Sequence, residues 1–347
     1  MSREMDMTLH ATPAPYRGPA IEAEHLVKRF GEMTAVDDVS FAVPQGSVLG
    51  LLGPNGAGKT TTVRMMTTLS RPTSGTARVA GHDVISDPDA VRRSMGLTGQ
   101  AATVDEFLTG RENLRLMGSL YGLSRREMTR ISDELLERFS IADAGDKVVK
   151  DYSGGMRRRL DLAVSLIAAP RVLFLDEPTT GLDPRSRVEL WSTLRELVAD
   201  GTTLLLTTQY LEEADQLADR IIVVDHGRII AEGTPLELKD RSGAAALVIT
   251  VSHAHELVAA QALLASHVRE VHVDPGARQL TAPVEGLADV MRVARVFEQS
   301  EIVLDDLGLK RPSLDDVFLH LTGRRAESEE SADDQAAEPA AVMEEVR

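Results

Sequence analysis

The stretch Gly53-Pro54-Asn55-Gly56-Ala57-Gly58-Lys59-Thr60 decides how the rest of this sequence is interpreted. It fits the pattern G-x-x-x-x-G-K-[ST] and stands between an apolar run at 48–52 and a helical stretch at 61–69, which begins with Thr61. Its glycines let backbone N–H groups turn inward around phosphate oxygens, and the start of a helix faces the anion with roughly half a positive charge. Lys59 is predicted to reach the β- and γ-phosphates of a nucleotide, and the Thr60 hydroxyl to ligate Mg²⁺. The alternative is a glycine-rich connection with a chance lysine.

Two carboxylates complete this prediction. The apolar run 172–175 predicts a buried strand that ends at Asp176 and Glu177. Open α/β sheets bind ligands at the carboxyl ends of their strands. We expect Asp176 to hold Mg²⁺ and Glu177 to orient and polarise an attacking water, since phosphoryl transfer mainly needs positioning and charge stabilisation. An Asp-Glu pair that merely caps the next helix is the other possibility.

The order of apolar runs indicates an α/β fold. Runs at 48–52, 172–175, 203–207 and 221–224 alternate with helical segments, which is typical of a mostly parallel core sheet. Residues 21–43 alternate in short runs, as antiparallel strands do. Residues 101–160 are predicted to form a helical insert, within a nucleotide-binding domain over 20–235.

A different pattern follows residue 235. Strands are predicted at 245–251, 268–273, 279–284 and 302–304, with helices at 255–265 and 287–298. The order β-α-β-β-α-β predicts a small ferredoxin-like α+β accessory domain over 236–325. A last helix, 314–321, is predicted from Ser313 with Asp316 three residues later.

Composition narrows the function classes. The chain has no cysteine, which excludes disulfides and thiolate metal sites. Of its net charge of −16, the acidic segment 326–347 carries −7; this tail and residues 1–19 are predicted to be disordered. The net negative charge argues against a nucleic-acid partner, because binding to phosphate groups needs clustered lysine and arginine. Because no stretch approaches the roughly 20 apolar residues of a spanning helix, any membrane role is expected to come through a partner.

The stretch Tyr152-Ser153-Gly154-Gly155-Met156-Arg157 separates families that share a phosphate loop. A serine followed by two glycines fits a helix start that something approaches closely. Such a helix start is a second anion site in the same chain. An ordinary Ser-capped helix that tolerates its glycines is the alternative.

At this point the chain resembles the ABC ATPase family over about residues 21–233. The features occur in the family's order: Phe30 for adenine stacking, the phosphate loop, Gln100 after a strand, Ser153-Gly154-Gly155, Asp176-Glu177 and Gly181-Leu182-Asp183. The resemblance implies ATP as the nucleotide, with Mg²⁺ near Thr60, Gln100 and Asp176. It also implies a head-to-tail dimer, in which Ser153 to Gly155 of one copy close on the ATP of the other, and it implies Asp183 as a further ATP-binding residue.

The sequence departs from the family pattern in two places. Tyr152 and Met156 replace the usual Leu and Gln that flank Ser-Gly-Gly. Gln209 stands where the family has a histidine after a strand, and because an amide cannot carry a proton, Glu177 remains as the general base. With Gln209 at this position, together with Thr98-Gly99-Gln100 and the closing segment 314–323, the sequence is similar to the daunorubicin-resistance branch of drug exporters.

We therefore expect the ATP-hydrolysing subunit of an exporter of an amphiphilic drug or antibiotic. It is expected to lie at the cytoplasmic face of the cell membrane, bound to a separate integral-membrane permease of the ABC-2 type. An importer subunit and a soluble ABC ATPase without a transport role are the alternatives. The sequence argues against the soluble class, because it has one phosphate loop, no long heptad run and a net negative charge. A neighbouring reading frame that encodes a protein with about six membrane-spanning segments would favour the exporter.

Overall fold

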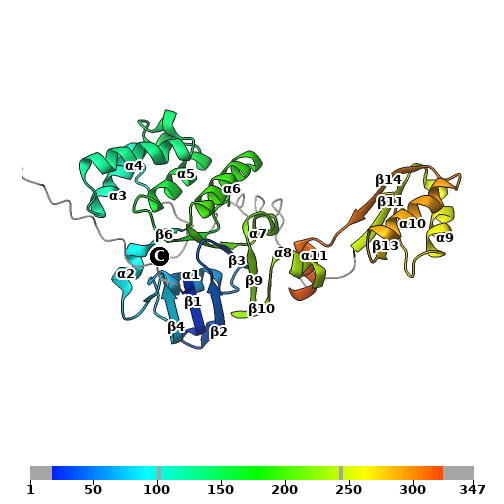
Figure 1. Ribbon diagram of the computed structural model, residues 1–347, viewed down its shortest axis with the longest axis horizontal. Helices are drawn as coiled ribbons and strands as arrows, with labels where there is room; N and C mark the ends of the chain where they lie inside the picture. The colour runs from blue at the N-terminus through cyan, green and yellow to red at the C-terminus, as the bar shows by residue number, and fades with distance from the viewer. Residues whose placement is uncertain (1–17, 100–102, 242–244, 323–347) are drawn as a thin grey trace, which may run out of the picture. The chain divides into compact units, whose positions relative to one another are not determined.

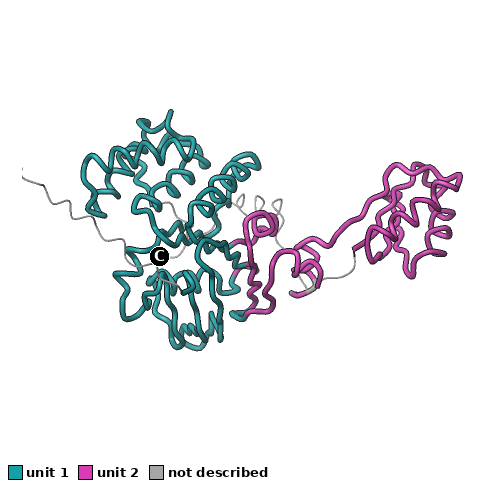
Figure 2. Tube along the Cα trace, in the orientation of Figure 1, with its two compact units in different colours: residues 1–51, 56–207, 226–228 teal, residues 52–55, 208–225, 229–347 magenta. Residues whose placement is uncertain are grey.

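The computed structural model describes residues 18–99, 103–241 and 245–322. The described residues form two compact units (Figure 2): those within 18–51, 56–207 and 226–228 make up the first, and those within 52–55, 208–225 and 229–322 the second. The boundary between the units falls inside the phosphate loop.

An antiparallel sheet opens the first unit. Its strands lie in the order β2-β1-β4-β5, with bounds Met33–Val43 (β2), Ile21–Phe30 (β1), Ser74–Val79 (β4) and His82–Asp83 (β5). Ile21, Ala23 and Leu26 of β1 are buried. The antiparallel strands expected from residues 21–43 are present.

The core sheet of the first unit explains the continuous apolar runs. Its strands are neighbours in the order β3 (Val48–Leu52), β8 (Thr203–Thr208), β7 (Val172–Asp176) and β6 (Met95–Thr98). Every residue of β3, β7 and β8 is buried, as expected where both faces of a parallel sheet are covered. β6 pairs with β7, and β7 with β8, in parallel. The predicted parallel core is confirmed.

Three helices of the first unit, α3, α4 and α5, form one group (Figure 1). α3 and α4 contact each other and both contact α5, and each of the two begins with a complete capping box, Thr109 with Glu112 and Ser124 with Glu127. The bounds are α1 Lys59–Met66, α2 Pro88–Ser94, α3 Gly110–Leu120, α4 Arg125–Arg138, α5 Gly154–Ser165 and α6 Pro184–Ala199. Residues 101–160, predicted as a helical insert, thus contain α3, α4 and the start of α5.

In the second unit the last helix packs against earlier ones. α11 contacts α8 and α7, and buries Leu314, Val317 and Phe318. Ser313 Oγ accepts a hydrogen bond from Asp316 N, and Asp316 Oδ2 accepts one from Ser313 N, so the predicted helix start is confirmed. The bounds are α7 Leu211–Leu217, β9 Arg220–Asp225, β10 Arg228–Gly233, α8 Pro235–Arg241 and α11 Leu314–Thr322.

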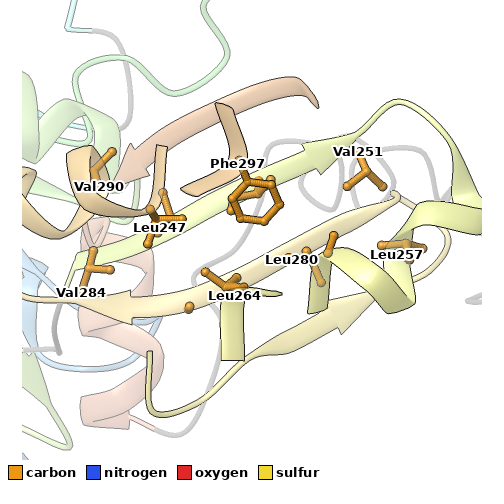
Figure 3. Close-up of a cluster of buried hydrophobic side chains, with 12 residues drawn as sticks. Leu247, Val251, Leu257, Leu264, Leu280, Val284, Val290 and Phe297 are labelled. Carbon is orange, nitrogen blue, oxygen red and sulfur yellow. The ribbon is translucent and has the colours of Figure 1, made fainter. Parts of the chain in front are cut away.

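The C-terminal sheet has the ferredoxin-like arrangement. Its antiparallel strands lie in the order β12-β13-β11-β14, with α9 and α10 in the two crossovers of a β-α-β-β-α-β chain. Figure 3 shows Leu247, Leu264, Leu280 and Phe297 in the apolar core between sheet and helices. The bounds are β11 Ala245–Val251, α9 Leu257–Ala265, β12 His272–Asp274, β13 Gln279–Val284, α10 Leu287–Glu298 and β14 Leu304–Lys310.

Two strands of this sheet differ from the prediction. β12 is confined to His272–Asp274, and β14 runs over Leu304–Lys310 instead of 302–304. Both are edge strands, so half of their backbone bonds find no partner strand and polar side chains are tolerated. Exposed Asp305 and Asp306 therefore hid β14 from a search for apolar runs. In the described part of the chain, no helix is both long and apolar enough to cross a membrane.

Candidate nucleotide-binding and hydrolysis site

Backbone shape in the phosphate loop requires glycine. Gly56 and Gly58 have φ of 80° and 105°, the left-handed region that side chains disfavour. A Cβ at Gly58 would lie 2.5 Å from the Ala35 carbonyl oxygen. Lys59, the first residue of α1, is buried. The strand-loop-helix context predicted for the loop is present, while Gly53, Pro54 and Asn55 belong to the second unit.

Thr60 and Asp176 come together as the sequence predicts. Thr60 Oγ1 donates a hydrogen bond of 3.2 Å to Asp176 Oδ1, although the two residues are 116 positions apart. Thr207, at the end of β8, donates a second hydrogen bond to the same oxygen. Hydroxyl and carboxylate oxygens are the ligands Mg²⁺ prefers, so this pair fits a magnesium ion. Parallel pairing of β7 with β8 puts Asp176 opposite Thr207 and explains the contact.

Glu177 occupies a strained turn immediately after β7. Its φ is 50°, unusual for a residue with a side chain, and its N–H donates to the Thr207 carbonyl oxygen at 3.0 Å. The Thr180 hydroxyl lies 3.4 Å from Glu177 Oε2. The Glu177 side chain borders a cleft of about 380 Å³, lined also by Gly154, Arg157, Arg158, Asp161, Thr180, Gly181 and Leu182. Glu177 therefore lies at the edge of a cleft that it shares with the first turns of α5.

The start of α5 has the geometry of an anion-binding helix end. Ser153 is the N-cap, and its Oγ accepts a hydrogen bond of 3.2 Å from Met156 N. A Cβ built on Gly154 would meet no atom within 4 Å, whereas one on Gly155 would lie 3.2 Å from Ser186 Oγ. This helix end is exposed at Ser153 and Gly154.

Tyr152, one of the departures from the family pattern, has a structural explanation. The ring is buried, its hydroxyl donates to the Ala144 carbonyl oxygen at 2.6 Å, and burial raises the pKa of the phenol. A Cβ on Gly110 would lie 2.3 Å from that hydroxyl, so a glycine at the start of α3 makes room for it. Tyr152 thus anchors the start of α5 to the helical insert.

Asp183 and Phe30 lie at two further predicted positions. Asp183 is the N-cap of α6, and its hydrogen bonds from the Ser186 hydroxyl and N–H hold the pKa of the carboxyl below its usual range. Phe30 ends β1 with half of its surface exposed, and the Lys28 ammonium lies 4.8 Å from the ring centroid. An exposed aromatic face beside a cation is suited to stacking on a planar base.

Two predicted residues are not placed beside this group. Gln100 lies outside the described residues. Gln209 follows β8 and belongs to the second unit; its Oε1 is buried and, among the described residues, accepts no hydrogen bond. Their roles stay predictions.

Sequence patterns missed two residues that the fold brings to the site. Thr207 was predicted only as part of a strand, yet its hydroxyl bonds Asp176. Arg158 follows the Ser-Gly-Gly stretch in a run of three arginines, and its guanidinium contacts the turn of Glu177. A signal for Thr207 was its place at the end of the predicted strand 203–207, since the carboxyl ends of parallel strands lie at one edge of a sheet.

Comparisons with known proteins identify the family of the chain. The family model described as ABC transporter matches residues 36–180. Daunorubicin resistance ATP-binding protein DrrA3 of Streptomyces coeruleorubidus is 54% identical over 314 residues, which cover 90% of this chain and 99% of that protein. Daunorubicin/doxorubicin resistance ATP-binding protein DrrA of Streptomyces peucetius is 50% identical over 328 residues, covering 94% and 98%.

Among solved structures, an ATP binding subunit of an ABC transporter matches with a TM-score of 0.59 and 29% identity. The match covers 64% of this chain and 92% of that one. Two observations establish the family: the similarity to this solved structure, and an identity of 50% or more over nearly the full length of two relatives. The chain therefore belongs to the ATP-binding proteins of the ABC transporter family, in the branch of the daunorubicin resistance proteins, and is an ATPase of that family.

Proposed function

We propose that this chain binds ATP with Mg²⁺ and hydrolyses it to drive export of an amphiphilic drug through a separate membrane permease. The observation that carries the proposal is the contact between Thr60 Oγ1 and Asp176 Oδ1, next to Glu177. It joins the phosphate loop to the two carboxylates, which is the arrangement phosphoryl transfer needs.

Each residue has a distinct part in the proposed reaction. Backbone N–H groups of the loop and the Lys59 ammonium hold the phosphates, and Phe30 stacks on adenine. Thr60 and Asp176 are the ligands offered to Mg²⁺, which when bound neutralises charge on the phosphates. Glu177 orients the attacking water and accepts its proton. Gln209 would donate a hydrogen bond to the γ-phosphate, and Gln100 would be a further ligand for Mg²⁺, as the resemblance to the family implies.

A head-to-tail dimer gives the start of α5 a ligand. The exposed Ser153 and the uncrowded Gly154 leave its backbone donors accessible. A helix start of this kind favours an anion. We infer that Ser153, Gly154 and Gly155 of one copy contact the γ-phosphate held by the loop of the other copy, with Asp183 beside it.

The permease partner is inferred from the helical insert and from the relatives. Phe107 and Leu120 are 74% and 72% exposed, and Leu116 and Tyr121 are also exposed apolar residues of α3 or its flanks. Exposed apolar residues gathered on one element are typical of a protein-binding surface. The relatives are named for daunorubicin and doxorubicin resistance, so an anthracycline-like amphiphile is the proposed cargo.

Co-expression tests the whole proposal. The chain and the membrane protein encoded beside it are produced in a drug-sensitive host, and cellular doxorubicin is followed by its fluorescence. We expect lower accumulation than with either protein alone, and no reduction with Glu177→Gln at equal protein levels. Unchanged accumulation across a panel of hydrophobic drugs, with ATP hydrolysis intact, would contradict drug export and favour import or a role outside transport.

A further inference from the structure

Arg158 connects α5 to the catalytic turn through backbone carbonyl groups. Its Nη2 donates to the carbonyl oxygens of Asp176 at 3.0 Å and Glu177 at 2.8 Å, and its Nε donates to that of Pro178 at 2.8 Å. Its Nη1 donates to the Gly99 carbonyl oxygen at 2.7 Å, just after β6. One guanidinium therefore satisfies the carbonyls of three consecutive residues around Glu177 and one of a neighbouring strand end.

Only a planar fork of donors can make these contacts together. Arginine has five N–H donors in a fixed plane and stays charged, whereas a lysine ammonium is a point charge with three donors. The side chain of Arg158 is 11% exposed, so its hydrogen bonds are shielded from water. These bonds hold the peptides on both sides of Glu177, whose φ of 50° is a conformation that a free chain seldom adopts.

Asp161, one turn further along α5, holds a second segment. It is fully buried at its side chain, and its Oδ1 accepts hydrogen bonds from the N–H, at 2.8 Å, and the hydroxyl of Thr103. Its Oδ2 lies 3.9 Å from Arg158 Nη1 and accepts no hydrogen bond from the described residues. Burial raises the pKa of this carboxyl. Arg158 and Asp161 thus face each other between the Glu177 turn, Gly99 and Thr103.

We propose that Arg158 is a positioning residue for ATP hydrolysis, which keeps the Glu177 carboxylate aimed at the attacking water by fixing the peptides on either side of it. Asp161 orients the guanidinium and ties Thr103 to the same helix. Movement of α5 is then transmitted directly to the Glu177 turn. The proposal rests on the proposed role of Glu177 as the base.

Full-length variants at Arg158 test this role. Two quantities are measured for Arg158→Met and for the parent. The first is the dissociation constant of a fluorescent ATP analogue in the presence of Mg²⁺. The second is the rate of a single turnover of radiolabelled ATP with protein in excess. We expect the rate to fall about 10- to 100-fold, or about 1.4–2.7 kcal/mol in activation free energy, while the dissociation constant changes less than about twofold. Arg158→Lys should recover part of the rate, because an ammonium reaches fewer of the four carbonyls. Asp161→Asn should lower the rate less.

Arg159→Met is the matched control. The neighbouring guanidinium is also mostly buried, but it pairs with Glu189 of α6. Its rate should stay within about threefold of the parent. Glu177→Gln is run in parallel: if it loses hydrolysis while folded Arg158→Met keeps the parent rate, the positioning role is wrong and the base assignment stands.

If Glu177→Gln hydrolyses ATP like the parent, the base assignment itself is wrong. A loss in Arg158→Met that is matched by an equal loss of ATP affinity would also overturn the positioning role. Should Arg158→Met fail to fold, Arg158→Lys at an unchanged melting temperature decides, since a parent-like rate there contradicts the proposal.

Discussion

Two neighbouring residues of the site differ in their surroundings. Asp176 and Glu177 are adjacent carboxylates, yet Asp176 is buried and receives hydroxyl hydrogen bonds from Thr60 and Thr207, whereas Glu177 borders an open cleft. The positive φ of Glu177 turns the backbone here, so that the two side chains lie in different surroundings. One carboxylate is therefore suited to a metal and the other to a water molecule.

Glu177→Gln should stop hydrolysis and leave ATP binding intact. The amide keeps the shape of the side chain but loses the charge that polarises water and accepts its proton. With ATP and Mg²⁺ retained, the variant is expected to accumulate as a dimer, measurable by size-exclusion chromatography with light scattering. Turnover equal to the parent's would remove Glu177 as the base. A monomer at saturating ATP, with or without the permease, would contradict the shared site.

Gln209→Ala should lower turnover about 10- to 150-fold, because one hydrogen bond to a charged group contributes about 1.5–3 kcal/mol. ATP affinity should change less, and Gln209→His should retain activity since imidazole can make a similar contact. The alternative is a polar strand end that caps α7, whose N-cap Tyr210 supplies no side-chain cap. Steady-state ATPase assays decide, and unchanged turnover in Gln209→Ala favours that alternative.

Among the elements, α5 has contacts that make it more than a support for the Ser-Gly-Gly stretch. Its start is anchored to the helical insert through Tyr152, and its first turns contact the Glu177 turn through Arg158. α3 and α4 contact it from the insert. α5 therefore contacts both the helical insert and the turn of Glu177.

Leu120→Asp at the end of α3 tests the proposed permease surface. A charge at an exposed apolar contact should weaken association about tenfold or more, or about 1.4 kcal/mol, without disturbing the fold. We expect loss of permease-stimulated ATPase activity in membranes and unchanged ATP binding by the chain alone. Val188→Asp is the control, because Val188 is an exposed apolar residue of α6. Equal stimulation in both variants would argue against this surface.

The whole chain contains more than one hydrophobic core. The C-terminal sheet with α9 and α10 buries a cluster of its own, which includes Leu247, Leu280 and Phe297 (Figure 3). The segment then returns through α11 to pack on α8 and α7. Stability of the C-terminal core is therefore expected to be separable from nucleotide binding.

Phe297→Ala should destabilise the C-terminal core by about 3–5 kcal/mol, since it removes a fully packed aromatic ring. ATP affinity should remain within about twofold, because sites that share no partners couple weakly. Hydrogen exchange measured by mass spectrometry should be faster in β11, β13, α9 and α10, which share this core, and unchanged in β7 and β8. Faster exchange throughout β7 and β8 would mean that the two cores unfold together.

Much of the fold could be predicted from local patterns. Strands buried on both faces are continuous apolar runs, so β3, β7 and β8 were found nearly to the residue. Edge strands carry no such signal, so β12 was predicted too long and β14 too short. The phosphate loop, the two carboxylates and the Ser-Gly-Gly helix start could be proposed as site residues from the sequence, because each needs particular residue types at fixed spacing.

Contacts between segments far apart in the chain required the folded molecule. The Thr207 bond to Asp176 follows from the register of β7 with β8, which no spacing in the sequence specifies. The four carbonyl oxygens that surround Arg158 carry no sequence signal at all, because every residue has one. The motifs thus indicated the family and its chemistry, whereas the packing of α5 against the ends of β6 and β7 brought Arg158 to the carbonyl groups around Glu177.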